Sequence, residues 1–189
     1  MTLKILAISG ALRAASTNTA LVRSLAALAP AGVEIEVYEG IGALPFFDQD
    51  LEAEPPASVV ELREKIIAAD GVFFATPEYN YSISAVLKNA IDWASRPYGR
   101  GALSGKPVAI AGTSGSDLGT VRAQLQLRDV LHGTDSDVVA RPEVHIGRNW
   151  ERFDAEGTLL DDTSRDLLTG LLSALALKIE EKQKAAVNA

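Results

Sequence analysis

The stretch Leu3–Gly10, LKILAISG, decides the fold, because it joins an apolar run to a small polar residue and a glycine. A compact, mainly apolar run of this length is typical of a buried strand in a parallel sheet. The following stretch, 18–29, is rich in Ala and Leu, with Leu21, Leu25 and Leu28 at helical spacing. A buried strand that runs into an amphipathic helix is the opening unit of a βαβ fold.

The rest of the chain repeats this alternation of strands and helices. No internal repeat or interdomain linker interrupts it. We therefore predict an α/β fold with one five-stranded, doubly wound parallel sheet, right-handed connections and helices on both faces. Further strands are expected over 33–38, 71–76, 107–112 and 138–146. Further helices are expected over 58–69 with Ser58 as the N-cap, after Ser82 or Ser84, over 120–131, and over 164–184 behind a capping box at 163–166.

The composition is that of one globular domain with an acidic surface. The chain has 189 residues, 47% of them hydrophobic, and a formal net charge of −7. This length usually forms one domain, and we expect a single domain over 1–189. The negative charge argues against general binding to nucleic acid or to an anionic membrane, since both need a basic surface. The absence of Cys excludes thiol catalysis, disulfides and thiolate metal sites.

The amino-terminal residues show no sorting signal. The apolar run over 3–8 is far shorter than a membrane span. It also lacks the basic region and the cleavage site of a signal peptide. We therefore expect a cytoplasmic protein.

Three loops follow the first, third and fourth predicted strands, where a doubly wound sheet binds its ligands. The first, Ser9–Asn18, has short polar side chains where the helix opens, and Arg13 adds a positive charge. Unpaired N–H groups and the helix dipole favour an anion at such a place. The loop has neither the Walker A pattern nor G-x-G-x-x-G. It predicts either a phosphate site without a metal or a capped helix with a solvated arginine.

The second and third loops suit a flat ring. In Pro77–Ser82, PEYNYS, tyrosines can pack on a heteroaromatic ring and backbone amides can bond its edge; alternatively, the tyrosines pack between elements. The glycines of 112–119, GTSGSDLG, permit close approach of a ligand to the backbone. That loop resembles a G-x-S-x-G elbow, but residue 116 is Ser where Gly is required. The two histidines, His132 and His145, form no clear triad or metal pair, and we expect them at a helix end and in a strand. A phosphate end and a flat aromatic end together suit flavin mononucleotide (FMN).

Three segments resemble the NADPH-dependent FMN reductase family in order and spacing. Residues 10–18, GALRAASTN, resemble its G-S-x-R-x-x-S-x-N loop, and residues 76–82, TPEYNYS, match its T-P-E-Y-N-x-S loop. Residues 87–93, LKNAIDW, match its helix of the same letters, and Gly105-Lys106-Pro107 also fits. The resemblance runs from about residue 3 to about residue 147, and it fits best the branch of bacterial quinone and chromate reductases.

The resemblance implies a flavodoxin-like fold that binds FMN noncovalently, with NADPH or NADH as co-substrate. It places the phosphate on the first loop, the isoalloxazine ring on the second, largely through backbone atoms, and the far edge of the ring on the third. The family has Ser where this chain has Ala11, which removes one hydroxyl donor to the phosphate, a loss of about 1 kcal/mol if neither Ser9 nor a water replaces it. The expected cofactor-binding residues are Ser9, Ala11, Leu12, Arg13, Ser16, Thr17, Asn18, Pro77, Glu78, Tyr79, Asn80, Tyr81, Ser114 and Gly115.

The resemblance also implies a reaction. Hydride passes from NAD(P)H to flavin N5, and two electrons then pass to a quinone or similar acceptor in a ping-pong exchange. We expect no catalytic side chain and no metal, because the sequence offers no convincing nucleophile, metal set or acid–base pair. A flavodoxin-like electron carrier or flavin-holding protein, without direct NAD(P)H oxidation, is the main alternative. A nucleotide-handling hydrolase or transferase is a second, for which the sequence supplies no base.

Family members usually form a homodimer or homotetramer, and the resemblance extends this expectation to the present chain. Trp93, Pro97 and Tyr98 are candidate interface anchors, although Trp93 suits the core equally well. The segment 44–48 either borders a neighbour's site or packs locally.

Overall fold

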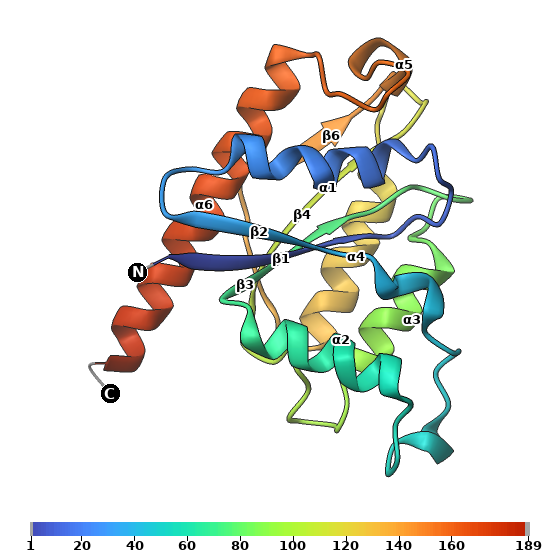
Figure 1. Cartoon of the computed structure of the whole chain (residues 1–189), viewed down its shortest axis with the longest axis vertical. Coiled ribbons are helices and arrows are strands. Elements are labelled where there is room, and N and C mark those ends of the chain that lie inside the picture. Colours follow the sequence, from blue (N-terminus) through green and yellow to red (C-terminus); the bar gives the residue numbers. More distant parts are fainter. Residues whose placement is uncertain (1, 188–189) are drawn as a thin grey trace.

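A computed structural model describes residues 2–187, which form three layers with a twisted parallel sheet in the middle (Figure 1). The strand order β2-β1-β3-β4-β5 confirms the predicted doubly wound sheet. The chain winds from β1 out to β2 and then crosses back to β3, so the switch in strand order lies between β1 and β3. The central strands are β1 (Leu3–Ser9), β3 (Gly71–Ala75) and β4 (Pro107–Thr113), and β2 (Val33–Tyr38) forms one edge.

The other edge differs from the prediction of a strand over 138–146. Two short segments, β5 (Asp137–Val138) and β6 (Val144–Ile146), both pair with β4 and share the fifth position of the sheet. Pro142 lies between them and has no N–H to donate to a ladder. The fifth strand is therefore interrupted.

Helices cover both faces of the sheet. The amphipathic faces of α1 (Thr17–Leu28) and α6 (Asp162–Val187) pack in one apolar cluster with residues of β1, β3 and β4. The opposite cluster contains α2 (Ala57–Ala68), α3 (Ala85–Ala94) and α4 (Val121–Gly133). Two 3-10 turns, η1 (Gly40–Ala43) and η2 (Gln49–Leu51), lie between β2 and α2, and the short α5 (Asn149–Arg152) follows β6.

The structure confirms one predicted cap and corrects two helix starts. Ser84 is the N-cap of α3, since its Oγ accepts from Leu87 N at 3.3 Å. Ser58 is not a cap, because α2 begins at Ala57, directly after Pro56. The last helix begins at Asp162, and its capping residues are Asp161 and Ser164 in place of the predicted capping box at 163–166. Asp161 accepts hydrogen bonds from both the N–H and the hydroxyl of Ser164, at 2.8 and 2.6 Å.

Trp93 belongs to the core. Its side chain is fully buried, its Nε1 donates to Pro45 O at 2.8 Å, and its ring lies 4.9 Å from that of Phe47. The expectation of an interface anchor at this residue is therefore wrong. Within residues 2–187, no helix has the length and apolar character needed to cross a membrane.

Candidate functional site

The three predicted loops meet at the carboxyl ends of β1, β3 and β4. Gly10 N donates to Ala75 O at 2.8 Å, and the Ser84 hydroxyl donates to Gly10 O at 2.6 Å. A Cβ on Gly10 would lie 3.1 Å from both Leu87 and Pro77. Glycine therefore lets the first two loops approach each other closely.

Asn18 joins the first loop to the third. Its Nδ2 donates to Thr113 O at 2.9 Å, and its Oδ1 accepts from Thr113 N at 3.0 Å. Asn18 is buried, so these bonds are shielded from water. The side chain is thus committed within the protein, and the group that Asn18 leaves for a ligand is its backbone N–H.

The start of α1 has the properties of an anion site. Ser16 caps the helix, since its Oγ accepts from Thr19 N at 3.5 Å and its carbonyl from Ala20 N at 2.9 Å. Within residues 2–187, the backbone N–H groups of Thr17 and Asn18 donate to no acceptor. Two free donors at the positive end of a helix dipole fit a phosphate group.

The other first-loop residues divide into exposed and buried groups. Arg13 is exposed, and its Nη2 donates to Ala15 O at 2.7 Å within the same loop. Leu12 is also exposed, whereas Ala11 is buried. Ser9 is buried, and its hydroxyl shares a hydrogen bond with Thr19 Oγ1 at 3.0 Å. Arg13 is therefore the exposed cation of the first loop.

The second loop forms a tight turn at the end of β3. Tyr79 N donates to Ser82 O at 3.0 Å, and Ser82 N donates to Tyr79 O at 2.9 Å. The two central residues, Asn80 and Tyr81, both have positive φ, 50° and 66°. This combination defines a type I′ turn, a conformation that a tyrosine rarely adopts. The turn exposes the rings of Tyr79 and Tyr81 and so offers a flat aromatic rim.

The side chain of Glu78 is bound to α4, which leaves the backbone of this residue for the expected contact with a ring. Its Oε2 accepts from the backbone N–H of Arg122 at 2.9 Å and of Ala123 at 3.1 Å. The carboxylate therefore caps α4 from another element, which is favourable at the positive end of a helix dipole. The neighbouring Thr120 makes no side-chain cap hydrogen bond, which leaves these N–H groups to Glu78.

Side chains of α4 hold the turn in this conformation. Gln126 Nε2 donates to Tyr81 O at 2.7 Å, and the Ser82 hydroxyl donates to Gln126 Oε1 at 2.6 Å. The guanidinium of Arg122 lies 4.1 Å from the centre of the Tyr81 ring, a cation–π contact. The left-handed residues are thus stabilised by contacts with a helix more than 40 residues away in the chain.

The third loop closes on itself. The Ser114 hydroxyl donates to Gly119 O at 2.5 Å and accepts from Ser116 N at 3.2 Å. A Cβ on Gly112 would lie 2.3 Å from Thr76 O, so only glycine fits there. The histidines occupy the predicted elements: His132 is exposed in the last turn of α4, and His145 is in β6, with its Nε2 at 3.6 Å from Glu143 Oε2.

A fourth segment, Gly147–Trp150, also reaches this edge, and sequence reasoning missed it. Asn149 N donates to Ser114 O at 3.2 Å, and Asn149 Nδ2 donates to Thr17 Oγ1 at 2.9 Å. Arg148 N donates to Ser116 O at 3.1 Å. Because these contacts join residues up to 132 positions apart, no local pattern could have predicted them.

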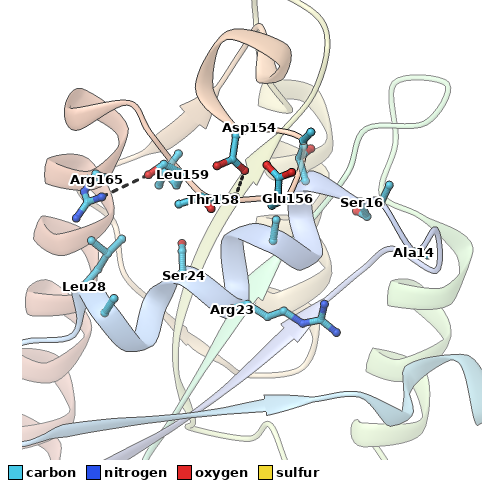
Figure 2. Close-up of a pocket in the computed structure, with 16 residues that line it drawn as sticks. Ala14, Ser16, Arg23, Ser24, Leu28, Asp154, Glu156, Thr158, Leu159 and Arg165 are labelled. Atoms are coloured by element: carbon cyan, nitrogen blue, oxygen red, sulfur yellow. Dashed lines mark hydrogen bonds between the residues drawn. The ribbon is translucent and has the colours of Figure 1, made fainter.

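A cavity of about 630 Å³ lies between α1 and the segment Asp154–Leu159 (Figure 2). It is lined by small residues of α1, by Asp154–Leu159, and by Arg23 and Arg165. It shares residues 14–17 with the first loop but includes no residue of the second or third loop. It therefore adjoins the start of α1 but does not include the part of the site that the second and third loops form.

The strand order 2-1-3-4-5, with an anion site and an aromatic rim at its switch point, defines a flavodoxin-like flavoprotein. Residues 3–151 match the NADPH-dependent FMN reductase family, and the chain belongs to this family. It is accordingly an oxidoreductase that uses FMN with NAD(P)H. The family assignment favours an enzyme over the electron-carrier alternative.

Three known proteins are similar along nearly their whole length. An NAD(P)H-dependent FMN reductase of Pseudomonas aeruginosa is 48% identical over 177 residues, 93% of this chain and 94% of that protein. A 2-hydroxy-1,4-benzoquinone reductase of a Burkholderia species is 38% identical over 97% of this chain and 100% of that protein. The solved structure of the flavoenzyme NAD(P)H:acceptor oxidoreductase FerB of Paracoccus denitrificans superimposes with a TM-score of 0.86 at 36% identity, covering 95% and 98% of the two chains.

Proposed function

We propose that this FMN-dependent oxidoreductase passes two electrons from NADPH or NADH to a quinone. The observation behind this proposal is a set of exposed apolar and aromatic side chains on the loops of the site, since Leu12, Tyr79, Tyr81 and Leu118 are all more than half exposed. Such side chains can pack on the face of a flat quinone ring. The similarity to the Burkholderia benzoquinone reductase supports the same class of acceptor.

The start of α1 would hold the FMN phosphate. The free N–H groups of Thr17 and Asn18 supply two donors. The hydroxyls of Ser16 and Thr17 each accept a hydrogen bond inside the protein, from Thr19 N and Asn149 Nδ2, so their O–H groups remain available to donate. The guanidinium of Arg13 adds a charge-assisted contact. This set offsets the hydroxyl that Ala11 lacks.

The second and third loops would hold the isoalloxazine ring through backbone atoms of Pro77–Tyr81 and of Ser114 and Gly115. FMN, when bound, supplies the redox chemistry between nicotinamide and quinone. The protein binds and orients the ring, because Gln126 and Arg122 fix the turn that meets it. The side chains of Asn18 and Glu78 are committed to backbone partners, so we assign no proton transfer to either.

We further propose that donor and acceptor use the site in turn. The test is steady-state kinetics of the FMN-loaded protein with NADPH and a benzoquinone, both varied. Parallel lines in double-reciprocal plots are expected, because the oxidised nicotinamide leaves before the quinone binds. Intersecting lines would contradict an exchange in two steps.

The assembly that we propose is a cytoplasmic homodimer or homotetramer. Phe46 and Tyr98 are large aromatic residues that are 81% and 88% exposed. An interface between copies would cover them. Light scattering on the eluted protein should give two or four times the 20.0 kDa chain mass, and a monomer would contradict this proposal.

A further inference from the structure

Trp150 is an exposed tryptophan at the edge of the sheet where the four segments meet. Trp150 is 65% exposed. Its indole nevertheless lies close to the third loop, since a Cβ on Gly115 would lie 3.3 Å from Trp150 Cζ3. The other tryptophan, Trp93, is fully buried. A large indole that is exposed beside a ligand-binding loop is available to contact the ligand.

The segment that bears Trp150 is fixed rather than loose. Asn149 bonds to both the first and the third loop, through Thr17 Oγ1 at 2.9 Å and Ser114 O at 3.2 Å. Arg148 has a left-handed backbone, φ 49°, which its N–H bond to Ser116 O and the bond of its Nε to Asp117 Oδ1 at 2.6 Å stabilise. The indole therefore has a defined place relative to the phosphate end and the ring end.

Close backbone contacts reinforce this placement. A Cβ on Gly147 would lie 2.4 Å from Asp117 O, so glycine lets the segment lie directly against the third loop. Gly115 likewise has no side chain to separate its backbone from the indole. The indole and the Gly115 backbone thus form one continuous surface at this edge of the site.

We propose that Trp150 is a fourth wall of the flavin site, which packs against the isoalloxazine ring beside Gly115. The inference rests on the proposed function, which places the ring edge at Ser114 and Gly115. The ligand chemistry that an indole recognises is a flat, neutral aromatic ring, and the tricyclic ring of FMN is the one that this function brings there.

Hydroxyl-radical labelling read by mass spectrometry tests this contact directly. The protein is labelled in the dark without and with FMN, and bound FMN is quantified by its visible absorption. Labelling of Trp150 should fall when FMN binds, while Trp93 stays unlabelled in both states. If Trp150 is labelled equally without and with bound FMN, its contact with the flavin is refuted and the proposed function is unaffected. Failure to bind FMN would overturn both.

Substitution gives a second readout that does not depend on activity. Trp150→Ala should weaken FMN binding about 2- to 10-fold, the range of an aromatic contact, and Trp150→Phe should weaken it less. Leu160→Ala is a control for the loss of an exposed apolar side chain, because Leu160 is 58% exposed and lies ten residues further along the chain. An unchanged dissociation constant for FMN in Trp150→Ala, titrated by flavin fluorescence, would overturn the inference.

Discussion

The side-chain amide of Asn18 forms a closed pair of hydrogen bonds with the backbone of Thr113, with Nδ2 to O at 2.9 Å and N to Oδ1 at 3.0 Å. This pair joins the first turn of α1 to the end of β4, two elements that are 95 residues apart in the chain. It fixes the distance between the anion site and the third loop. The two ends of the site are therefore positioned by one buried side chain.

Asn18→Leu should lower both stability and FMN affinity. It removes two buried hydrogen bonds and leaves the Thr113 backbone without partners, at a cost of about 2–3 kcal/mol in the free energy of unfolding. Urea unfolding measures the first effect, and FMN titration of the folded variant measures the second. A variant as stable as the wild type would show that the pair contributes nothing.

Arg13→Ala should weaken FMN binding with little change in stability. Arg13 is exposed and bonds only within its own loop, so its loss leaves the fold intact. Losing one charge-assisted contact with the phosphate corresponds to roughly a tenfold rise in the dissociation constant. The effect should shrink at high salt. Arg23→Ala, which removes an exposed arginine from the middle of α1, is the control and should bind FMN normally.

Asn80 offers a matched pair of substitutions in the second loop. Proline fixes φ near −65°, which is incompatible with the value of 50° here, so Asn80→Pro should disrupt the turn and lower the FMN affinity roughly tenfold or more. Glycine adopts positive φ freely, so Asn80→Gly should retain the flavin. The flavin content of each purified variant checks this. Equal flavin in both would remove the turn from the site.

The cap of α6 should make stability depend on pH. Hydrogen bonds from Ser164, with a contribution from Arg152, lower the pKa of Asp161 below its ordinary value of 3.8. A lowered pKa in the folded state means that the ionised form adds stability above pH 3.8, and that this is lost as the pH falls through the folded value. Asp161→Asn should therefore be less stable than the wild type at pH 7, by about 1 kcal/mol, and the gap should close below pH 4. A gap that is independent of pH would contradict the charged cap.

Much of the fold could be predicted because its signals are local. Buried strands such as Gly71–Ala75 are continuous apolar runs, and α1 and α3 have helical spacing with serine caps. The three loops could be identified because they follow those strands. The interrupted fifth strand shows the limit, since a run of apolar residues does not reveal where pairing with β4 stops.

The parts of the site that could not be predicted depend on distant contacts. Glu78 caps a helix that begins 43 residues later, and Asn149 bonds to Thr17 across 132 positions. The start of α4 and the segment around Asn149 carry no recognisable motif. The hydrogen-bond partner of the Asn18 side chain could not be predicted either, because an amide at the start of a helix can bind a phosphate as well as the backbone of a neighbouring strand.

The most direct test of the central claim is the visible spectrum of the FMN-loaded protein before and after anaerobic addition of NADPH. An FMN-dependent NAD(P)H:quinone reductase should lose its flavin bands quickly and recover them when a quinone is added. Flavin bands that persist with both NADPH and NADH would contradict this account.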